Sequence, residues 1–224
     1  MNDSSRSGER FVAELVGEME EVFARLREQE TLESESGGRP ELVTLLKLAA
    51  SSELEAAELA GSWLPSTPEL PAKELFAAQC GEEMRHLKLI LERLAELGED
   101  VDAFDPGGDG PSPLQEYLRG LDTTVERIAA GPFAREAIAR VRNDQFIAFC
   151  RAADDETTAR LYEELIQPEE QHHHEVGRRL LERYAVTPES REAAAAAVRN
   201  TLAIADELRT LMERTTGGRP VPLS

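Results

Sequence analysis

The sequence contains little cysteine and histidine, few aromatic residues and no long apolar run. Its 224 residues include 2 cysteines and 4 histidines, and aromatic side chains make up 5%. Two cysteines cannot build the disulfide framework of a small secreted domain, so we expect the protein to work in a reducing compartment. No apolar run approaches the roughly 20 residues that a helix needs to cross a bilayer, so we expect no membrane partner.

Basic residues are also scarce relative to acidic residues. The chain has 25 lysines and arginines against 44 aspartates and glutamates, which gives a net charge of −19. Affinity for nucleic-acid phosphates and for anionic membrane surfaces comes from concentrated basic side chains, so we expect neither kind of partner. The first residues, MNDSSRSGER, lack the apolar core of a signal peptide, and we therefore expect a cytoplasmic protein.

The residues that are abundant favour helices. Alanine, leucine, glutamate and arginine dominate, and no stretch alternates apolar and polar residues for long enough to suggest a strand. Short clusters of proline, glycine and aspartate divide the chain into helical segments. The sequence therefore predicts an all-α fold in a single domain over residues 1–224. Four long helices are expected at about 40–64, 71–97, 133–153 and 156–184, and three further helices at about 7–30, 112–130 and 188–215.

The four long segments form two consecutive pairs, 40–97 and 133–184, and only a short break separates the two helices of each pair. Two helical hairpins of similar length can pack side by side as a four-helix bundle. The segment 7–30 carries an apolar stripe of its own. We expect this stripe to pack across the bundle or against a second copy in a homodimer.

A Glu-x-x-His motif occurs once in each expected hairpin. The first motif runs from Glu83 to His86 and the second from Glu170 to His173. Residues three apart are neighbours on one helix face, so the carboxylate and the imidazole can converge on a single point. These two ligand types together suit iron or manganese. One such motif arises easily in an acidic chain, but all 4 histidines of this chain lie in or beside the two motifs.

The second motif has an alternative register. Shifting it by one residue pairs Glu169 with His172, and the apolar periodicity of the segment permits both choices. In both motifs a second glutamate directly precedes the first ligand position, which gives the pairs Glu82-Glu83 and Glu169-Glu170. Matching the second glutamate of each pair favours Glu170 and His173.

Each partner helix contributes one acid on its apolar face. Glu53 interrupts the apolar stripe of the second expected helix, and Asp144 lies on the apolar face of the fifth. Glu55 and Glu58 are alternatives to Glu53, although both lie off the stripe. Glu136 is the alternative to Asp144, but it shares its face with polar residues, which indicates a solvated position.

With these motifs the chain resembles the ferritin-like superfamily of dinuclear carboxylate proteins, over roughly residues 40–184. In such bundles one acid from each of two helices and a Glu-x-x-His motif from each of the other two bind a pair of metal ions. The resemblance implies the following metal ligands: Glu53, Glu83, His86, Asp144, Glu170 and His173.

The acidic pair in each motif, Glu82-Glu83 and Glu169-Glu170, is also similar to the acid-Glu-x-Arg-His pattern of bacterial multicomponent monooxygenases. This similarity implies that Glu83 and Glu170 bridge the two ions and that the two histidines are terminal ligands. Glu82 and Glu169 would then orient the imidazoles from outside the metal shell.

The resemblance also implies a function. Two iron ions bridged by carboxylates can bind O2, so the expected protein is an O2-dependent oxidoreductase or oxygenase with a small-molecule substrate. The ligand set accepts Mn/Fe or Mn/Mn equally well.

Three other functions remain open. The protein could be a ferroxidase or another iron-handling protein, or it could resemble a manganese catalase. A third possibility is a metal-free helical interaction module in which Arg85 and Arg140 pair with the buried acids.

Overall fold

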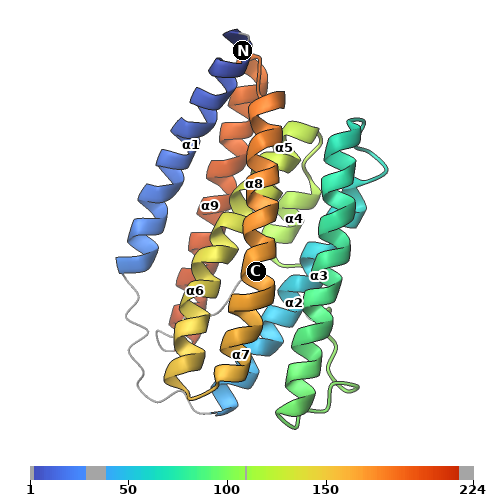
Figure 1. Ribbon diagram of the computed structural model, residues 1–224, viewed down its shortest axis with the longest axis vertical. Helices are drawn as coiled ribbons and strands as arrows, with labels where there is room; N and C mark the ends of the chain where they lie inside the picture. Colours follow the sequence, from blue (N-terminus) through green and yellow to red (C-terminus); the bar gives the residue numbers. More distant parts are fainter. Residues whose placement is uncertain (1–2, 29–38, 109, 217–224) are drawn as a thin grey trace.

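Long, roughly parallel helices make up the computed structural model, which describes residues 3–28, 39–108 and 110–216 (Figure 1). Within those ranges the chain forms helices, turns and loops but no strand, so the prediction of an all-α fold is confirmed. The core consists of two helical hairpins, as the four long segments predicted.

The first hairpin consists of α2 (Arg39–Trp63) and α3 (Leu70–Glu96), which lie side by side. Both helices begin and end within one residue of the predicted bounds. The Thr67 hydroxyl donates to the carbonyl of Trp63 at 2.9 Å just after the end of α2. A proline opens α3, where a missing amide hydrogen costs nothing.

The second hairpin pairs α6 (Glu136–Ala152) with a return helix built of three consecutive parts. These parts are α7 (Glu156–Leu161), the π-helix η2 (Tyr162–Ile166) and α8 (Gln167–Tyr184). The side chain of Asp155 caps α7 by accepting a hydrogen bond from the Thr158 amide at 3.1 Å. Pro168 does not interrupt this return helix, because it lies in the first turn of α8 and η2 leads into α8 without a gap.

The break expected at Gly131 and Pro132, between the predicted helices 112–130 and 133–153, is wrong. The chain runs from α5 (Thr124–Ile128) through the π-helix η1 (Ala129–Arg135) directly into α6. Pro132 cannot donate a helical hydrogen bond, and the helix widens here instead of ending. A Cβ atom at position 131 would lie 2.9 Å from the ring of Trp63, so the glycine allows this segment to pack closely.

The remaining helices lie around the bundle. They are α1 (Asp3–Glu28), α4 (Pro113–Arg119) and α9 (Pro188–Thr216). The predicted helix 112–130 is therefore wrong as a single element, since α4 and α5 are separate. Residues 29 and 30 of the predicted first helix lie outside the described residues.

Helix α1 packs against α8 and α9 with its apolar stripe inward. The most buried apolar side chains of α1, at most 4% exposed, are Val12, Leu15, Met19 and Phe23, whereas Phe11 and Val22 of the predicted stripe are half-buried. Of the two expectations for this stripe, packing across the bundle is the one that the structure shows. A homodimer stays a prediction.

Two apolar clusters fill the interior, and a polar layer separates them. Along α2, one cluster takes Leu42 to Ala50 and the other takes Leu59 to Trp63. Along α3, the order is reversed, as expected for an antiparallel neighbour. Charged and polar side chains in the middle of both helices therefore lie between two apolar blocks.

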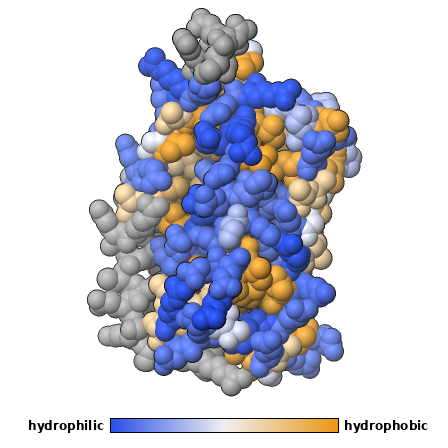
Figure 2. Space-filling view, viewed as in Figure 1, coloured by the Kyte–Doolittle hydropathy of each residue, from blue (hydrophilic) through white to orange (hydrophobic). Residues whose placement is uncertain are grey.

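The visible face in Figure 2 is mainly hydrophilic, with separate apolar patches, in keeping with the net charge of −19. Four large apolar side chains are well exposed among the described residues: Leu70, Met84, Leu165 and Val186. Among the described helices, none combines the length and the apolarity needed to span a membrane.

Candidate metal centre

The polar layer contains a group of six buried side chains, which we call the acid–histidine cluster. Each of them is at most 1% exposed. Helices α2, α3, α6 and α8 supply the members: Glu53, Glu83, His86, Glu136, Glu170 and His173. They fall into two overlapping groups of four, and within each group the possible ligand atoms lie within 4.8 Å of one another.

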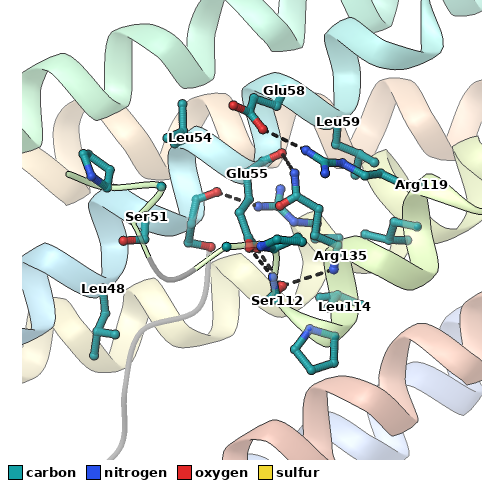
Figure 3. A pocket seen from close by; sticks show the side chains of 18 residues that line it. Leu48, Ser51, Leu54, Glu55, Glu58, Leu59, Ser112, Leu114, Arg119 and Arg135 are labelled. Carbon is teal, nitrogen blue, oxygen red and sulfur yellow. Dashed lines mark hydrogen bonds and ion pairs between the residues drawn. The ribbon is translucent and has the colours of Figure 1, made fainter.

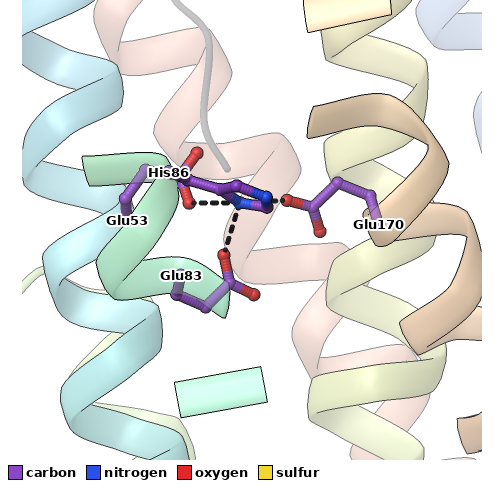
Figure 4. Close-up of side chains that lie close together, drawn as sticks. All are labelled: Glu53, Glu83, His86 and Glu170. Carbon is purple, nitrogen blue, oxygen red and sulfur yellow. Dashed lines mark hydrogen bonds and ion pairs between the residues drawn. The ribbon is translucent and has the colours of Figure 1, made fainter. Parts of the chain in front are cut away.

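Glu83 and Glu170 occupy the middle of the cluster. Glu83 places Oε2 3.2 Å from Nδ1 of His86 and Oε1 3.5 Å from Nδ1 of His173. Glu170 places Oε1 3.4 Å from Nδ1 of His86 and Oε2 3.8 Å from Nδ1 of His173. Each of these carboxylates therefore presents one oxygen to each imidazole. Figure 4 shows three carboxylates of the cluster turned toward His86.

The outer nitrogens of both imidazoles contact acids of the opposite helix. His86 Nε2 lies 3.0 Å from Oε2 of Glu169, and His173 Nε2 lies 2.6 Å from Oε2 of Glu82. Arg85 in turn forms an ion pair with Glu169. These crossed contacts fix the ring orientation and direct Nδ1 of both histidines into the cluster.

Many atoms of the cluster have no hydrogen-bond partner among the described residues. Both oxygens of Glu53 and of Glu170, one oxygen each of Glu83 and Glu136, and Nδ1 of His173 are buried in this way. Burying carboxylates without donors is costly, and a bound cation removes that cost. The oxygen and nitrogen donors present are those preferred by iron and manganese. The cluster therefore fits a dinuclear metal site.

Burial and mutual repulsion change the acidity of the carboxyl groups. Burial raises the pKa of Glu53 well above its usual value, and the neighbouring charge of Glu83 adds to this effect. Burial and the charge of Glu170 raise the pKa of Glu136 in the same way. The metal-free cluster therefore retains protons that bound cations would displace.

The pKa values of both imidazoles are raised, whereas burial ordinarily lowers the pKa of a histidine. Burial alone lowers the pKa of His173, but Glu170 and Glu83 raise it to about 9. Burial also opposes protonation of His86, and its three carboxylate neighbours overcome this and raise its pKa. Protonated imidazoles thus supply the positive charge in the metal-free protein.

Asp144, the acid predicted from the second hairpin, is not in the cluster. It is exposed, and its carboxylate accepts a hydrogen bond from Gln167 at 2.8 Å. Glu136 takes the position instead and is fully buried. The prediction that Asp144 faces the other acids and that Glu136 is solvated is therefore wrong.

The packing of α1 explains this error. The apolar stripe that pointed to Asp144 includes Ala137 and Val141, and these residues line a small cavity together with Val16 and Met19 of α1. The stripe is thus a real apolar face, but it faces α1 rather than the bundle interior. Residues 128–139 are buried without exception, so no periodicity marks the inward side there.

The alternatives to Glu53 have other partners. Glu55 accepts hydrogen bonds from the amide and the hydroxyl of Ser112, at 2.5 and 2.7 Å. Glu58 forms an exposed ion pair with Arg119 at 2.8 Å. Glu53 is the acid of α2 that lies in the cluster.

The favoured register of the second motif is the one that the structure places inward. Glu170 and His173 are buried in the cluster, whereas His172 is exposed and Glu169 is half-buried outside it. Five of the six residues predicted as ligands are therefore brought together.

Two further residues hold Glu136 and were not predicted. Gln79 Nε2 donates to Oε1 of Glu136 at 2.5 Å, and Arg135 Nη1 donates to the same oxygen at 3.3 Å. Gln79 precedes Glu83 by four residues on the same helix face, so its place was deducible from spacing. Arg135 lies in η1, where no pattern in the sequence marks it.

A family model described as the ferritin-like domain matches residues 47–184, which is more than half of the chain. The matched range includes all members of the acid–histidine cluster. No curated protein and no solved structure matches the chain. The family match and the buried cluster therefore concern the same part of the molecule.

Proposed function

Since the chain belongs to the ferritin-like domain family, we propose that it binds two iron ions and is an O2-dependent oxidoreductase with a small organic substrate. One observation carries the proposal: Glu83 and Glu170 each turn one oxygen to each imidazole of the cluster. A carboxylate placed in this way can bridge two cations.

The arrangement assigns a role to each side chain. Glu53 and His86 would hold one ion, Glu136 and His173 would hold the other, and Glu83 and Glu170 would contribute an oxygen to each. Glu136 replaces Asp144 in the ligand set. Four carboxylates with two neutral imidazoles balance the charge of two divalent ions, which suits a buried site.

A bound pair of iron ions supplies redox chemistry with O2. The chain's own residues orient the ligands and exclude water. Glu82 and Glu169 hold the imidazoles, and the two apolar clusters close the site from both ends. Mn/Fe and Mn/Mn pairs suit the same donors and stay alternatives.

The metal-free alternative requires arginines such as Arg85 and Arg140 to neutralise the buried acids, and Arg135 does donate to one of these acids, Glu136, at 3.3 Å. Arg85 instead pairs with Glu169 outside the cluster, and both oxygens of Glu53 lack a hydrogen-bond partner. These contacts favour a metal site over an interaction module.

Metal content tests the proposal directly. The protein is loaded with Fe(II) in the absence of oxygen and desalted. Its iron content per chain is then measured by elemental mass spectrometry. We expect two ions per chain. His173→Ala should lose metal, whereas His172→Ala, a change at the exposed neighbouring histidine, should retain it. Wild-type protein that binds well under one ion per chain would contradict the proposal.

Oxygen uptake then separates the possible activities. The loaded protein should consume O2 with a reductant present and turn over repeatedly without taking up more iron. Continued oxidation and storage of added Fe(II), in a large assembly by size-exclusion chromatography, would indicate iron handling. Rapid breakdown of peroxide by the manganese form would indicate a catalase-like protein.

A further inference from the structure

A pocket of about 440 Å³ opens between α2, α4 and the preceding loop residues 106, 107 and 110–112 (Figure 3). Its walls are mainly apolar and include Leu48, Leu54, Leu59, Leu114 and Leu118. Pockets for small organic ligands generally enclose about 300–1,000 Å³ and are lined mostly by apolar side chains. The size and the lining of this pocket therefore suit a small organic molecule.

The inner wall of the pocket adjoins the acid–histidine cluster. Ser52 and Arg135 line the pocket, and they are the chain neighbours of Glu53 and Glu136. The Arg135 guanidinium donates to Oε1 of Glu136 and to the carbonyl of Ser52, both at 3.3 Å. Arg135 thus forms part of the pocket wall and also holds an acid of the cluster.

The charged residues of the lining balance one another. Glu58 and Arg119 form an ion pair at the exposed rim, and Glu55 is held by Ser112. Together with Arg135, the lining has two acids and two arginines. Such a lining does not favour an ion of either sign, and the polar atoms suit a single oxygen of a neutral ligand.

We propose that this pocket is the substrate chamber of the centre and takes a neutral, mostly hydrocarbon molecule with one carbonyl or hydroxyl oxygen directed toward Arg135. The proposal rests on the proposed function, because it places the substrate beside that centre. In this arrangement the ligand oxygen approaches the Arg135 guanidinium, which also donates to Glu136.

Binding of a dye to the metal-free protein tests the pocket itself. Prodan, a neutral naphthalene ketone whose emission reports polarity, should bind with a blue shift. The naphthoate with the same dimethylamino ring should bind at least about tenfold more weakly, since its carboxylate loses hydration in a mainly apolar pocket whose charged side chains already have partners. Equal or tighter binding of the naphthoate would overturn the assigned ligand class.

Two matched substitutions locate the bound dye. Leu54→Trp fills the pocket and should weaken prodan binding at least about tenfold. Leu91→Trp changes another partly buried leucine packed on the same apolar cluster, outside the pocket, and should leave binding unchanged. Loss of binding in neither variant, or in both, would overturn the pocket as the binding site.

Cobalt absorption tests the connection between pocket and centre. Saturating the Co(II)-loaded protein with prodan should change the visible spectrum of the metal, and Leu54→Trp should abolish the change while retaining the cobalt. An unchanged cobalt spectrum with prodan bound would contradict the proposal that the pocket is the substrate chamber of the centre. A protein that binds prodan but no cobalt contradicts the proposed function, whereas one that binds cobalt but no prodan contradicts the pocket alone.

Discussion

The two halves of the acid–histidine cluster have nearly the same sequence motif but are held differently. In the half of Glu136 and His173, one carboxylate oxygen of Glu136 accepts hydrogen bonds from Gln79 and Arg135. In the half of Glu53 and His86, neither oxygen of Glu53 accepts a hydrogen bond, although its Oε2 lies 3.5 Å from Nδ1 of His86 in an ion pair. Glu136 is thus oriented before any ion binds, whereas Glu53 can adjust.

This difference shows that a repeated motif does not make equivalent sites. A ligand that is already oriented loses less conformational freedom on binding and restricts the geometry of the ion more strongly. Glu53, which no hydrogen-bond donor of the described residues holds, can bind through one oxygen or both. We therefore expect the two ions to differ in affinity, with the Glu136 half the more selective.

Removing a central carboxylate should have the largest effect on metal content, since Glu83 and Glu170 belong to both halves of the cluster. In Glu83→Ala, the metal content after Fe(II) loading should fall from two ions per chain to near zero. Glu164→Ala, at an exposed glutamate of η2, is the control and should bind normally. Full metal content in Glu83→Ala would show that Glu83 is not a bridging ligand.

Removing a terminal acid should separate the halves. Glu53→Ala and Glu136→Ala should each retain about one ion per chain, because the bridging acids and one histidine persist in the other half. Competitive titration with a chelator measures the affinity of the ion that remains. Identical losses of both ions in both variants would indicate that the two sites bind as one unit.

Gln79→Leu tests the difference in ion affinity between the two halves without removing a ligand. It deletes one donor to Glu136, and the loss of such an outer contact typically lowers metal affinity about 10–100-fold. The effect should fall on the ion of the Glu136 half. Gln171→Leu, at an exposed glutamine, serves as the control. Equal weakening of both ions would contradict the asymmetry.

The smallest expected effect is the change of melting temperature with pH in the metal-free protein. The folded pKa of His173 is about 9, above its unfolded value, so its stabilising contribution is present below about pH 6.5 and is lost as the pH rises through 9. The raised pKa values of Glu53 and Glu136 act in the same direction. We expect the melting temperature to fall by about 5 °C over this range.

The His173→Asn variant provides the comparison for this measurement, because it should flatten the dependence. Bound metal should also flatten it, since the ions displace these protons. A metal-free melting temperature that rises between pH 6.5 and 9 would contradict the assigned protonation of His173.

Much of the cluster was predictable from spacing within single helices. Glu83 with His86, and Glu170 with His173, share a face because of the helical period alone. Glu53 was identifiable because it interrupts an apolar stripe that does face the bundle. These predictions depend on the spacing of residues within one helix, which does not depend on the tertiary structure.

The acid of α6 was not predictable in this way. An apolar stripe shows that a face is buried, but not which neighbour buries it. Helix α1, more than a hundred residues earlier in the chain, covers the face of Ala137 and Val141 and leaves Asp144 exposed at its edge. The expected break at Pro132 concealed the error further, because η1 continues the helix and brings Glu136 to the depth of the other acids.

Most of the helices, their pairing into hairpins and the inward face of the first Glu-x-x-His motif follow from composition and the helical period, whereas periodicity left two registers open for the second motif. Only the tertiary structure decided that Glu136 completes the cluster, that Gln79 and Arg135 hold it, and that a pocket reaches Arg135. These features depend on contacts between segments far apart in the chain, and periodicity within one helix carries no information about them.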